Sequence, residues 1–307
     1  MAGDAAYIEP VNSARFRRAG EDDLPAVWEI LHAIEYGRSA PMSPAGDPPS
    51  YLRHELTTGT MWVAETGGAL VGYAALIVRG GVGFIAELFV RRESQSARIG
   101  GALLAKLLEA ASPTFCTMSS GDPRALSLYI RAGLQPRWPH FQLIGSPEHL
   151  PRPGPEVEVR DVEEKDETII GWDAEISGRA RAQEHAYWRS THAVPLWVCG
   201  KERTVGYGYV HRTPATAGAA AGVLLGPIGA RSAADAAASL DAILRWSRRL
   251  GRVVHVGIPG PHPSLPVLLR AGFRLKFIET YCCSNATDLF DPRTYIPSTT
   301  IEGTALL

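Results

Sequence analysis

The run from Leu88 to Leu104 holds the residue types and the spacing best suited to chemistry. The pattern predicts an apolar strand, a short polar turn and a helix with apolar residues at helical spacing. Unpaired backbone N–H groups at such a turn, together with the helix dipole, form an anion site suited to a pyrophosphate, and small side chains let a phosphate approach. The residues expected to form this site are Leu88, Phe89, Val90, Gln95, Ser96, Ala97, Arg98, Ile99, Gly100, Gly101 and Ala102.

A loop-to-helix junction alone is common in α/β domains. A second segment, Ser119 to Leu134, makes the interpretation of the first one more specific. Gln95 to Gly100 resembles the Gln/Arg-x-x-Gly-x-Gly/Ala signature of GNAT acyltransferases, and the second segment resembles their N-x-x-A-x-x-L-Y-x-x-x-G-F segment. The chain is thus identified as a tandem member of the GNAT (GCN5-related N-acetyltransferase) superfamily. The resemblance implies acetyl-CoA as co-substrate. Arg98 departs from the signature, which has a glycine there; its side chain could crowd the loop or contact a phosphate.

The resemblance also implies catalytic roles. Tyr129 matches the family's tyrosine general acid, since a phenol is protonated at pH 7 and can give a proton to a departing thiolate. Glu87 would be a general base, acting through water, and the N–H of Phe89 or Val90 would polarise the thioester carbonyl. The alternatives are an ordinary helix tyrosine and a solvent-facing strand carboxylate. Residues expected near the acceptor are His32, Glu35 and Tyr36, with His54 beside the same loop.

The sequence contains an internal repeat. Arg131-Ala132-Gly133 recurs as Arg270-Ala271-Gly272, and Val71-Gly72-Tyr73 recurs as Val205-Gly206-Tyr207, in the same order and at a nearly constant offset. The resemblance covers roughly the whole of each half. The fold class expected is α/β (α+β): two tandem GNAT-like domains, each a mixed, mostly antiparallel central sheet flanked by helices. The predicted domains are a catalytic domain (1–146) and a degenerate domain with a C-terminal tail (157–307), joined by a Pro-rich linker (147–156).

The second half lacks the glycine signature. Arg231 to Ala236 keeps only the spacing, Asp235 would place a negative charge near the phosphates, and Leu268 stands at the catalytic tyrosine position. We therefore expect this half to be a structural or substrate-shaping partner, with a second active site as the alternative.

Composition excludes several other classes. The 31 basic and 32 acidic residues give a net charge of −1, which indicates no nucleic-acid or membrane partner. Four cysteines without CxxC spacing predict neither a metal site nor a disulfide framework. No signal peptide or membrane-spanning run is expected, so the predicted location is the cytoplasm of a bacterium, as a monomer or homodimer.

These observations predict an enzyme, an acyl-CoA-dependent N-acetyltransferase acting on a primary amine of a small molecule or peptide. The alternatives left open are a non-catalytic acyl-CoA sensor or scaffold and a mycothiol synthase-like acyltransferase. The acceptor, the acyl chain length and the pathway are not encoded in these motifs.

Overall fold

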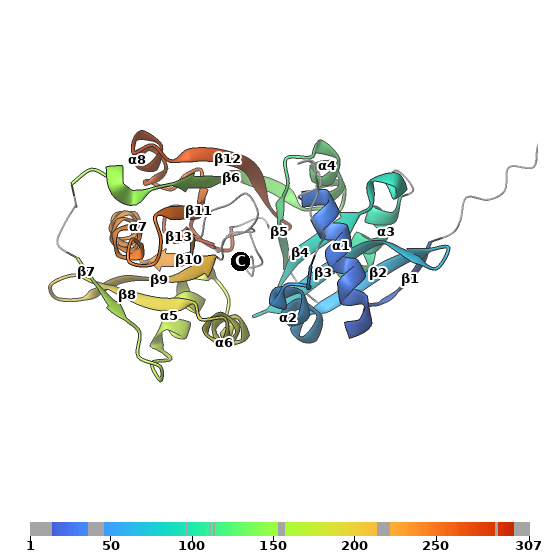
Figure 1. The fold of residues 1–307 in the computed structure, drawn as a ribbon, viewed down its shortest axis with the longest axis horizontal. Helices are drawn as coiled ribbons and strands as arrows, with labels where there is room; N and C mark the ends of the chain where they lie inside the picture. The colour runs from blue at the N-terminus through green and yellow to red at the C-terminus, as the bar shows by residue number, and fades with distance from the viewer. Residues whose placement is uncertain are drawn as a thin grey trace, which may run out of the picture. The chain divides into compact units, whose positions relative to one another are not determined.

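The computed structural model describes residues 14–35, 46–95, 98–110, 112, 114–152, 157–213, 222–285 and 288–297 (Figure 1). The chain packs as two compact units, each described here by itself. The first packing unit comprises Met1–Leu76 and Glu87–Ala110, and the second comprises Ile77–Ala86 and Ala111–Leu307. Two strands, β3 and β4, run from one unit into the other.

The first packing unit contains strands in the order β1-β2-β3-β4, with antiparallel β1–β2 and β2–β3 pairs. Its apolar helix face lies on α1, where Leu24, Val27, Ile30 and Leu31 are buried as their helical spacing predicts. Its elements are β1 (Arg15–Arg18), η1 (Glu21–Asp23), α1 (Leu24–Glu35), α2 (Ser50–Thr58), β2 (Thr60–Thr66), β3 (Ala69–Arg79), β4 (Val82–Val90), η2 (Arg92–Ser94) and α3 (Ile99–Leu108).

The second packing unit contains strands in the order β4-β5-β12-β6-β11-β10-β9-β8-β7, and β13 pairs with β10. Its elements after the end of β4 are β5 (Thr114–Ser119), α4 (Pro123–Arg131), β6 (Gln135–Gly145), η3 (Pro147–His149), β7 (Glu158–Asp161), α5 (Thr168–Ser177), α6 (Ala182–Ser190), β8 (Val194–Cys199), β9 (Thr204–Thr213), β10 (Gly222–Ala230), α7 (Ala233–Ser247), β11 (Val253–Pro259), α8 (Leu265–Arg270), β12 (Arg274–Cys283) and β13 (Tyr295–Ile296). A large apolar core is formed mainly by residues of α7 and of strands β8 to β11.

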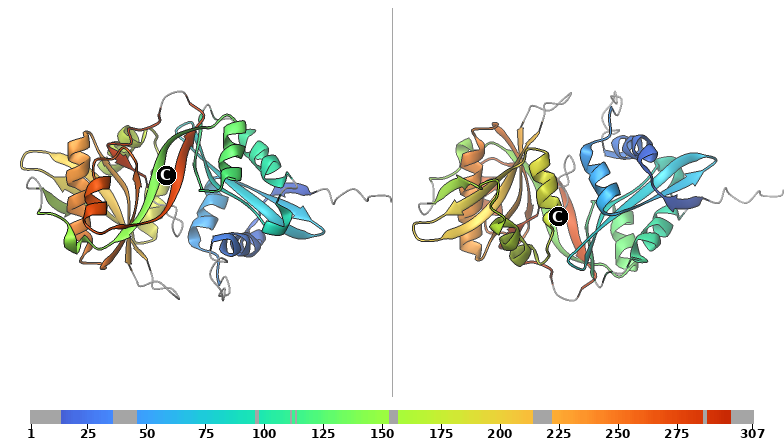
Figure 2. Two further views of the ribbon diagram at one scale, coloured as in Figure 1. Left: turned by 90° about the horizontal axis from the view of Figure 1, so that it is seen from above. Right: turned by 90° about the horizontal axis from the view of Figure 1, so that it is seen from below.

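The two halves of the sequence exchange strands within this unit. Strand β12, the long strand after α8, lies between β5 and β6, and β6 in turn lies between β12 and β11. Figure 2 shows β6 in green beside β12 in red-orange along their length. All these pairings are antiparallel, so each half of the sequence completes its ladder with a strand from the other half.

The internal repeat has a physical basis at Gly72 and Gly206. A Cβ on Gly72 would lie 2.9 Å from the backbone oxygen of Phe89 and 3.4 Å from Leu103 of α3. A Cβ on Gly206 would lie 2.9 Å from the oxygen of Gly229 and would collide with Ser239 of α7. Both glycines therefore let the next strand and the following helix approach β3 and β9 closely. The fold class predicted from the sequence, a mixed and mostly antiparallel sheet flanked by helices, is confirmed.

Among the described residues, no helix combines the length and the apolar character needed to cross a membrane. The domain boundaries predicted in the Pro-rich stretch 147–156 stay a prediction.

Candidate active site

The start of α3 presents an anion-binding geometry in the first packing unit. Arg98, at the N-cap, has φ 61° and ψ 10°, the left-handed conformation that glycine favours. Arg98 makes no capping hydrogen bond with its side chain among the residues that the structure describes, and the amides of a first helical turn have no intrahelical acceptor. The Gln95 side chain donates to the Val90 oxygen at 3.0 Å and ties the turn to β4. Ser96 and Ala97 lie outside the described residues.

The helix that follows is built to hold this turn in place. Ile99, Leu103, Leu104 and Leu107 are buried, while the small residues Gly100, Gly101 and Ala102 lie on its first turns. Small side chains leave room for an anion near the helix N-terminus, where the dipole favours negative charge. The residues at the start of α3 therefore fit a pyrophosphate.

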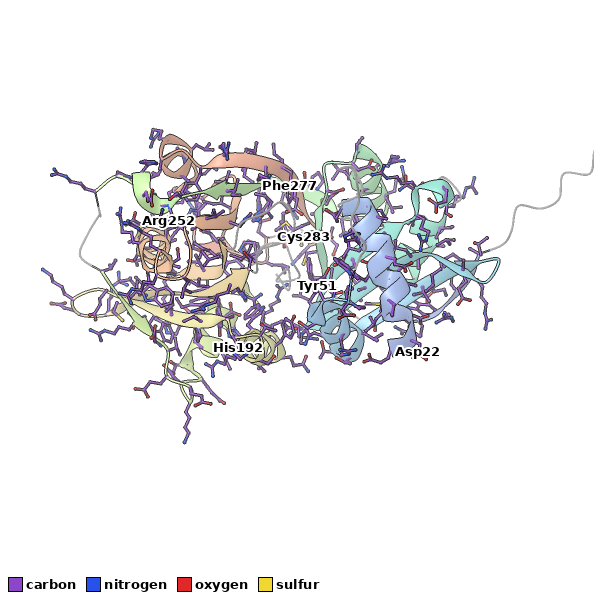
Figure 3. All side chains as sticks on the ribbon, in the orientation of Figure 1. Asp22, Tyr51, His192, Arg252, Phe277 and Cys283 are labelled. Carbon is purple, nitrogen blue, oxygen red and sulfur yellow. The ribbon has the colours of Figure 1, made fainter. Side chains whose placement is uncertain are left out.

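Three carboxylates and two phenols form a second feature of the same unit, which we call the acidic cluster: Glu35, Tyr51, Glu55, Tyr73 and Glu87. Tyr73 of β3 donates a hydrogen bond to Oε2 of Glu87 on β4 at 3.4 Å. Burial raises the pKa of Glu87 to about 8, with a further contribution from the charge of Glu35, whereas the Tyr73 hydrogen bond lowers it. Figure 3 labels Tyr51, which marks the place of the cluster on α2.

Glu55 is the most deeply buried carboxylate of the acidic cluster. Only 2% of it is exposed, and within the described part of the chain its Oε2 has no hydrogen-bond partner. Burial, and then the charge of Glu87, raise its pKa well above the ordinary value. Carboxyl groups with strongly raised pKa values are common in catalytic centres.

Glu87 and Glu35 were predicted as site residues from the sequence, whereas Glu55, Tyr51 and Tyr73 were not. The available signal was the spacing of Tyr51, Leu52 and Glu55, which places an acidic side chain on the buried face of α2. His32 lies on α1, where its ring centroid is 5.3 Å from that of Trp28 in an edge-to-face arrangement. Tyr36 lies outside the described residues.

Tyr129 belongs to the second packing unit, on α4. Its side chain is buried, with 6% exposed, and its backbone oxygen accepts the N–H of Leu134 at 3.0 Å. Asp122 caps the helix by accepting from the Arg124 N–H, and Gly133 ends it at φ 90°. The roles of Tyr129 and of the amides of Phe89 and Val90 stay predictions. The ladder between β4 and β5 holds three pairs and ends at Phe84–Cys116.

The equivalent helix of the second half, α7, has a different start. Ser232 accepts a hydrogen bond from the Asp235 N–H, and its hydroxyl contacts the Asp235 carboxylate at 2.9 Å. Asp235 also pairs with Arg203 at 3.0 Å. The first turn of α7 is thus capped by its own side chains and carries a negative charge, which disfavours a phosphate.

The interior near α5 and α6 holds a closed polar network. Asp173 accepts two hydrogen bonds from the guanidinium of Arg181, at 2.6 and 2.7 Å, and a third from the hydroxyl of Tyr207. His185 lies 3.1 Å from the same carboxylate, and all four side chains are buried. The nearby charge of Arg181 and its hydrogen bonds outweigh burial and hold the pKa of Asp173 below its ordinary value.

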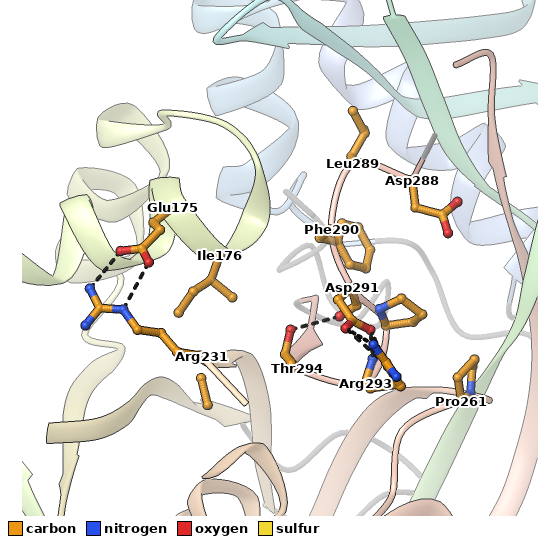
Figure 4. A pocket seen from close by; sticks show the side chains of 12 residues that line it. Glu175, Ile176, Arg231, Pro261, Asp288, Leu289, Phe290, Asp291, Arg293 and Thr294 are labelled. Carbon is orange, nitrogen blue, oxygen red and sulfur yellow. Dashed lines mark hydrogen bonds and ion pairs between the residues drawn. The ribbon is translucent and has the colours of Figure 1, made fainter. Parts of the chain in front are cut away.

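A cavity of about 820 Å³ lies in the second packing unit, between α5, the end of β10 and the segment Asp288–Thr294 (Figure 4). Arg231 lies at its edge, paired with Glu175 at 2.7 Å and stacked over the ring of Trp172 at 4.0 Å. A second hollow, of about 610 Å³, lies in the first packing unit and is lined by Arg17, Glu29 and Arg91 among others. Neither contains Glu87 or Glu55. In the described part of the chain, no group of three His, Cys, Asp or Glu side chains is placed to hold a metal ion.

One family model matches the part of the chain that holds these features. Residues 25–134 match the family model described as the acetyltransferase (GNAT) family. No curated protein matches the chain. The match includes the acidic cluster, the start of α3 and Tyr129.

Solved structures share the fold over nearly the whole chain. A protein from Pyrococcus horikoshii, described as a candidate acetyltransferase, is 17% identical with a TM-score of 0.72, covering 97% of this chain and 99% of its own. A GCN5-related N-acetyltransferase from Sphaerobacter thermophilus is 16% identical with a TM-score of 0.60, covering 91% and 96%. A tandem GNAT protein from the clavulanic acid biosynthesis pathway is 17% identical with a TM-score of 0.58, covering 90% and 100%.

Proposed function

We propose that this chain is an N-acetyltransferase, because residues 25–134 match the model of the GNAT acetyltransferase family and the chain shares its fold with solved GNAT proteins along its length. The reaction proposed is transfer of an acetyl group from acetyl-CoA to a primary amine by direct attack. The observation that carries the proposal is the raised pKa of Glu87, about 8, in the same packing unit as the uncapped start of α3.

The proposed donor site is the turn from Gln95 through Ala102. The N-terminus of α3 would receive the pyrophosphate on its free amides, and Arg98 would add a charge at the edge of the turn. The self-capped, acidic start of α7 supports the first half as the working one. Acetyl-CoA supplies the activated thioester.

Glu87 has the properties that the acceptor requires. A lysine-like amine has a pKa of about 10.4 and is mostly charged at pH 7, so it must lose a proton before it attacks. A carboxylate with a pKa near 8 is a stronger base than an ordinary glutamate and accepts that proton, directly or through water. The neutral amine then attacks the thioester carbon and forms the new C–N bond, and the C–S bond breaks. In the proposed assignment the departing thiolate takes a proton from Tyr129, and the second proton of the nitrogen returns to the Tyr129 phenolate, which leaves the neutral amide and free CoA thiol.

Titration calorimetry with acetyl-CoA tests the donor site. Gly100→Trp fills the first turn of α3, and Ala234→Trp fills the exposed first turn of α7. We expect one-site binding that Gly100→Trp abolishes and Ala234→Trp retains. The reverse result would move the donor site to the second half.

A turnover assay with acetyl-CoA and a panel of primary amines tests the chemistry. Release of free CoA thiol that depends on both the amine and Glu87 supports an N-acetyltransferase. Tight binding of acetyl-CoA with no turnover of any amine would instead favour the non-catalytic sensor.

A further inference from the structure

The acidic cluster holds more carboxyl groups than a single general base requires. Glu35 ends α1, Glu55 lies on α2 and Glu87 lies on β4, so three elements bring a carboxylate to one place. Burial first, and then the charge of Glu35, raise the pKa of Glu87, and burial and then the charge of Glu87 raise that of Glu55, so the three carboxyl groups lie within electrostatic reach of one another, and the Tyr73 hydrogen bond holds Glu87 among them. Glu35 is exposed, so the cluster reaches the surface at the end of α1.

Neither inner carboxylate has a cationic partner. In the described part of the chain, no Lys, Arg or His forms an ion pair with Glu55 or Glu87, and Oε2 of Glu55 accepts no hydrogen bond. Leaving a buried carboxylate unpaired costs free energy, whereas a pairing cation with matching donors offsets that cost. The cluster is therefore poised to take up a positive charge from outside the chain.

The second half of the chain supplies a comparison, since Tyr207 stands in the repeat where Tyr73 stands in the first half. Each tyrosine donates to a carboxylate, Tyr207 to Asp173 and Tyr73 to Glu87. In the second half an internal guanidinium, that of Arg181, neutralises this carboxylate. Arg181 also lies over the ring of Trp188, 4.9 Å from its centroid. No residue described in the first packing unit takes the place of Arg181 beside Glu87 and Glu55.

We propose that the acceptor is a dicationic amine, with one amine that is acetylated and a second ammonium or guanidinium group that stays charged and pairs with Glu55. Small diamines, amino-guanidines and basic amino acid amides belong to this class. The inference rests on the proposed function, because it names the substrate class of the same site. The retained cation also neutralises the cluster, which keeps Glu87 ionised and able to accept the proton of the reacting amine.

The test compares two probes of equal carbon length, 1,5-diaminopentane and pentylamine, with acetyl-CoA as donor. We expect kcat/KM to be at least about 10-fold higher for the diamine, corresponding to about 1.4 kcal/mol. Glu55→Gln keeps the size of the side chain and removes its charge, so the ratio should fall to near one. Glu109→Gln, an exposed carboxylate at the end of α3, should leave the ratio unchanged. An equal or greater preference for pentylamine, or a ratio that survives Glu55→Gln, would overturn the inference.

A binding measurement separates this inference from the proposed function. Calorimetric titration of 1,5-diaminopentane into the full chain, in two buffers of different ionisation enthalpy, counts protons released as the cation enters the cluster. We expect proton release that Glu55→Gln reduces and Glu35→Gln reduces less. Such release without turnover would reject the acetyltransferase and retain the cation site. Turnover of pentylamine without diamine binding would do the opposite, and the absence of both would reject both.

Discussion

Tyr73 and Glu87 face each other from neighbouring strands, and the tyrosine hydroxyl donates to the carboxylate at 3.4 Å. This single contact opposes the two effects that raise the pKa of Glu87, burial and the charge of Glu35. Beyond burial, the proton affinity of the proposed base depends on two neighbouring side chains, Glu35 of α1 and Tyr73 of β3. Each can be changed separately without altering the size of the residue greatly.

Glu87→Gln should lower kcat/KM by about 10²–10⁴-fold, the usual contribution of a positioned general base. The amide keeps the shape of the carboxylate but accepts no proton from the amine. The measurement is steady-state turnover with acetyl-CoA and a reactive amine, with acetyl-CoA affinity measured in parallel. Glu109→Gln is the control. Retention of full activity in Glu87→Gln at pH 7 would remove Glu87 from the mechanism.

The pH dependence of kcat/KM should rise through about pH 8, because the base works only when ionised. Tyr73→Phe removes the hydrogen bond that lowers the pKa of Glu87, so this limb should move to higher pH. Glu35→Gln removes a charge that raises the same pKa, so the limb should move to lower pH. Shifts in the same direction for both variants would contradict the assignment of the limb to Glu87.

Arg98 carries backbone strain that its replacement should relieve. A side chain at φ 61° costs about 1–2 kcal/mol relative to the right-handed region, whereas glycine adopts this conformation freely. After allowance for the entropy of glycine in the unfolded chain, Arg98→Gly should raise the free energy of unfolding by about 0.5–1 kcal/mol. Urea denaturation measures the change.

Arg98→Ala is the matched variant, because it removes the guanidinium but keeps a Cβ at the same positive φ. It should give no gain in stability. If Arg98 contacts a phosphate, both variants should weaken acetyl-CoA binding equally in calorimetry. A stability gain in Arg98→Ala equal to that in Arg98→Gly would show that the strain is not in the backbone.

Local patterns predicted much of the fold. The helix Pro123–Arg131 begins at a proline that follows the capping side chain of Asp122, and both residues favour a helix start. Gly133 follows that helix at φ 90°, as a glycine at the C′ position should. These features depend on neighbours in the sequence, so single residues report them.

The exchange of β6 and β12 could not be predicted in the same way. Gln142 on β6 donates to Glu279 on β12 at 2.7 Å, although the two residues are 137 positions apart. Nothing in either strand's own alternation specifies which distant strand it pairs with, because many registers bury the same apolar residues. The place of β12 between β5 and β6 follows from tertiary packing alone.

Some residues of the candidate site could likewise be predicted from the sequence, and one could not. Glu87 could be predicted from its place on a strand that precedes a recognisable turn, and Arg98 from its place in the signature. Glu55 could not, because one acidic residue in a short polar helix ordinarily lies in solvent. Its burial, and hence its raised pKa, exists only once α2 packs in the folded unit.

The last prediction concerns Arg79 and Glu184, which join the end of β3 to α6 within the second packing unit. Nε of Arg79 lies 2.8 Å from both carboxylate oxygens, and the two side chains are 9% and 0% exposed. Glu184→Gln removes the negative charge that Glu184 places against this guanidinium and should lower the free energy of unfolding by about 3–5 kcal/mol. The exposed pair Arg231–Glu175 has the same chemistry, so Glu175→Gln should cost less than about 1 kcal/mol.

The double variant Arg79→Met/Glu184→Leu distinguishes the worth of the pair from the cost of breaking it. Apolar side chains of similar volume remove both buried charges together, so the double variant should lose far less stability than Glu184→Gln alone. Urea unfolding of the three variants and the control measures these differences. A loss in the double variant as large as in Glu184→Gln would mean that the ion pair itself, and not the avoidance of an unpaired charge, stabilises the contact between β3 and α6.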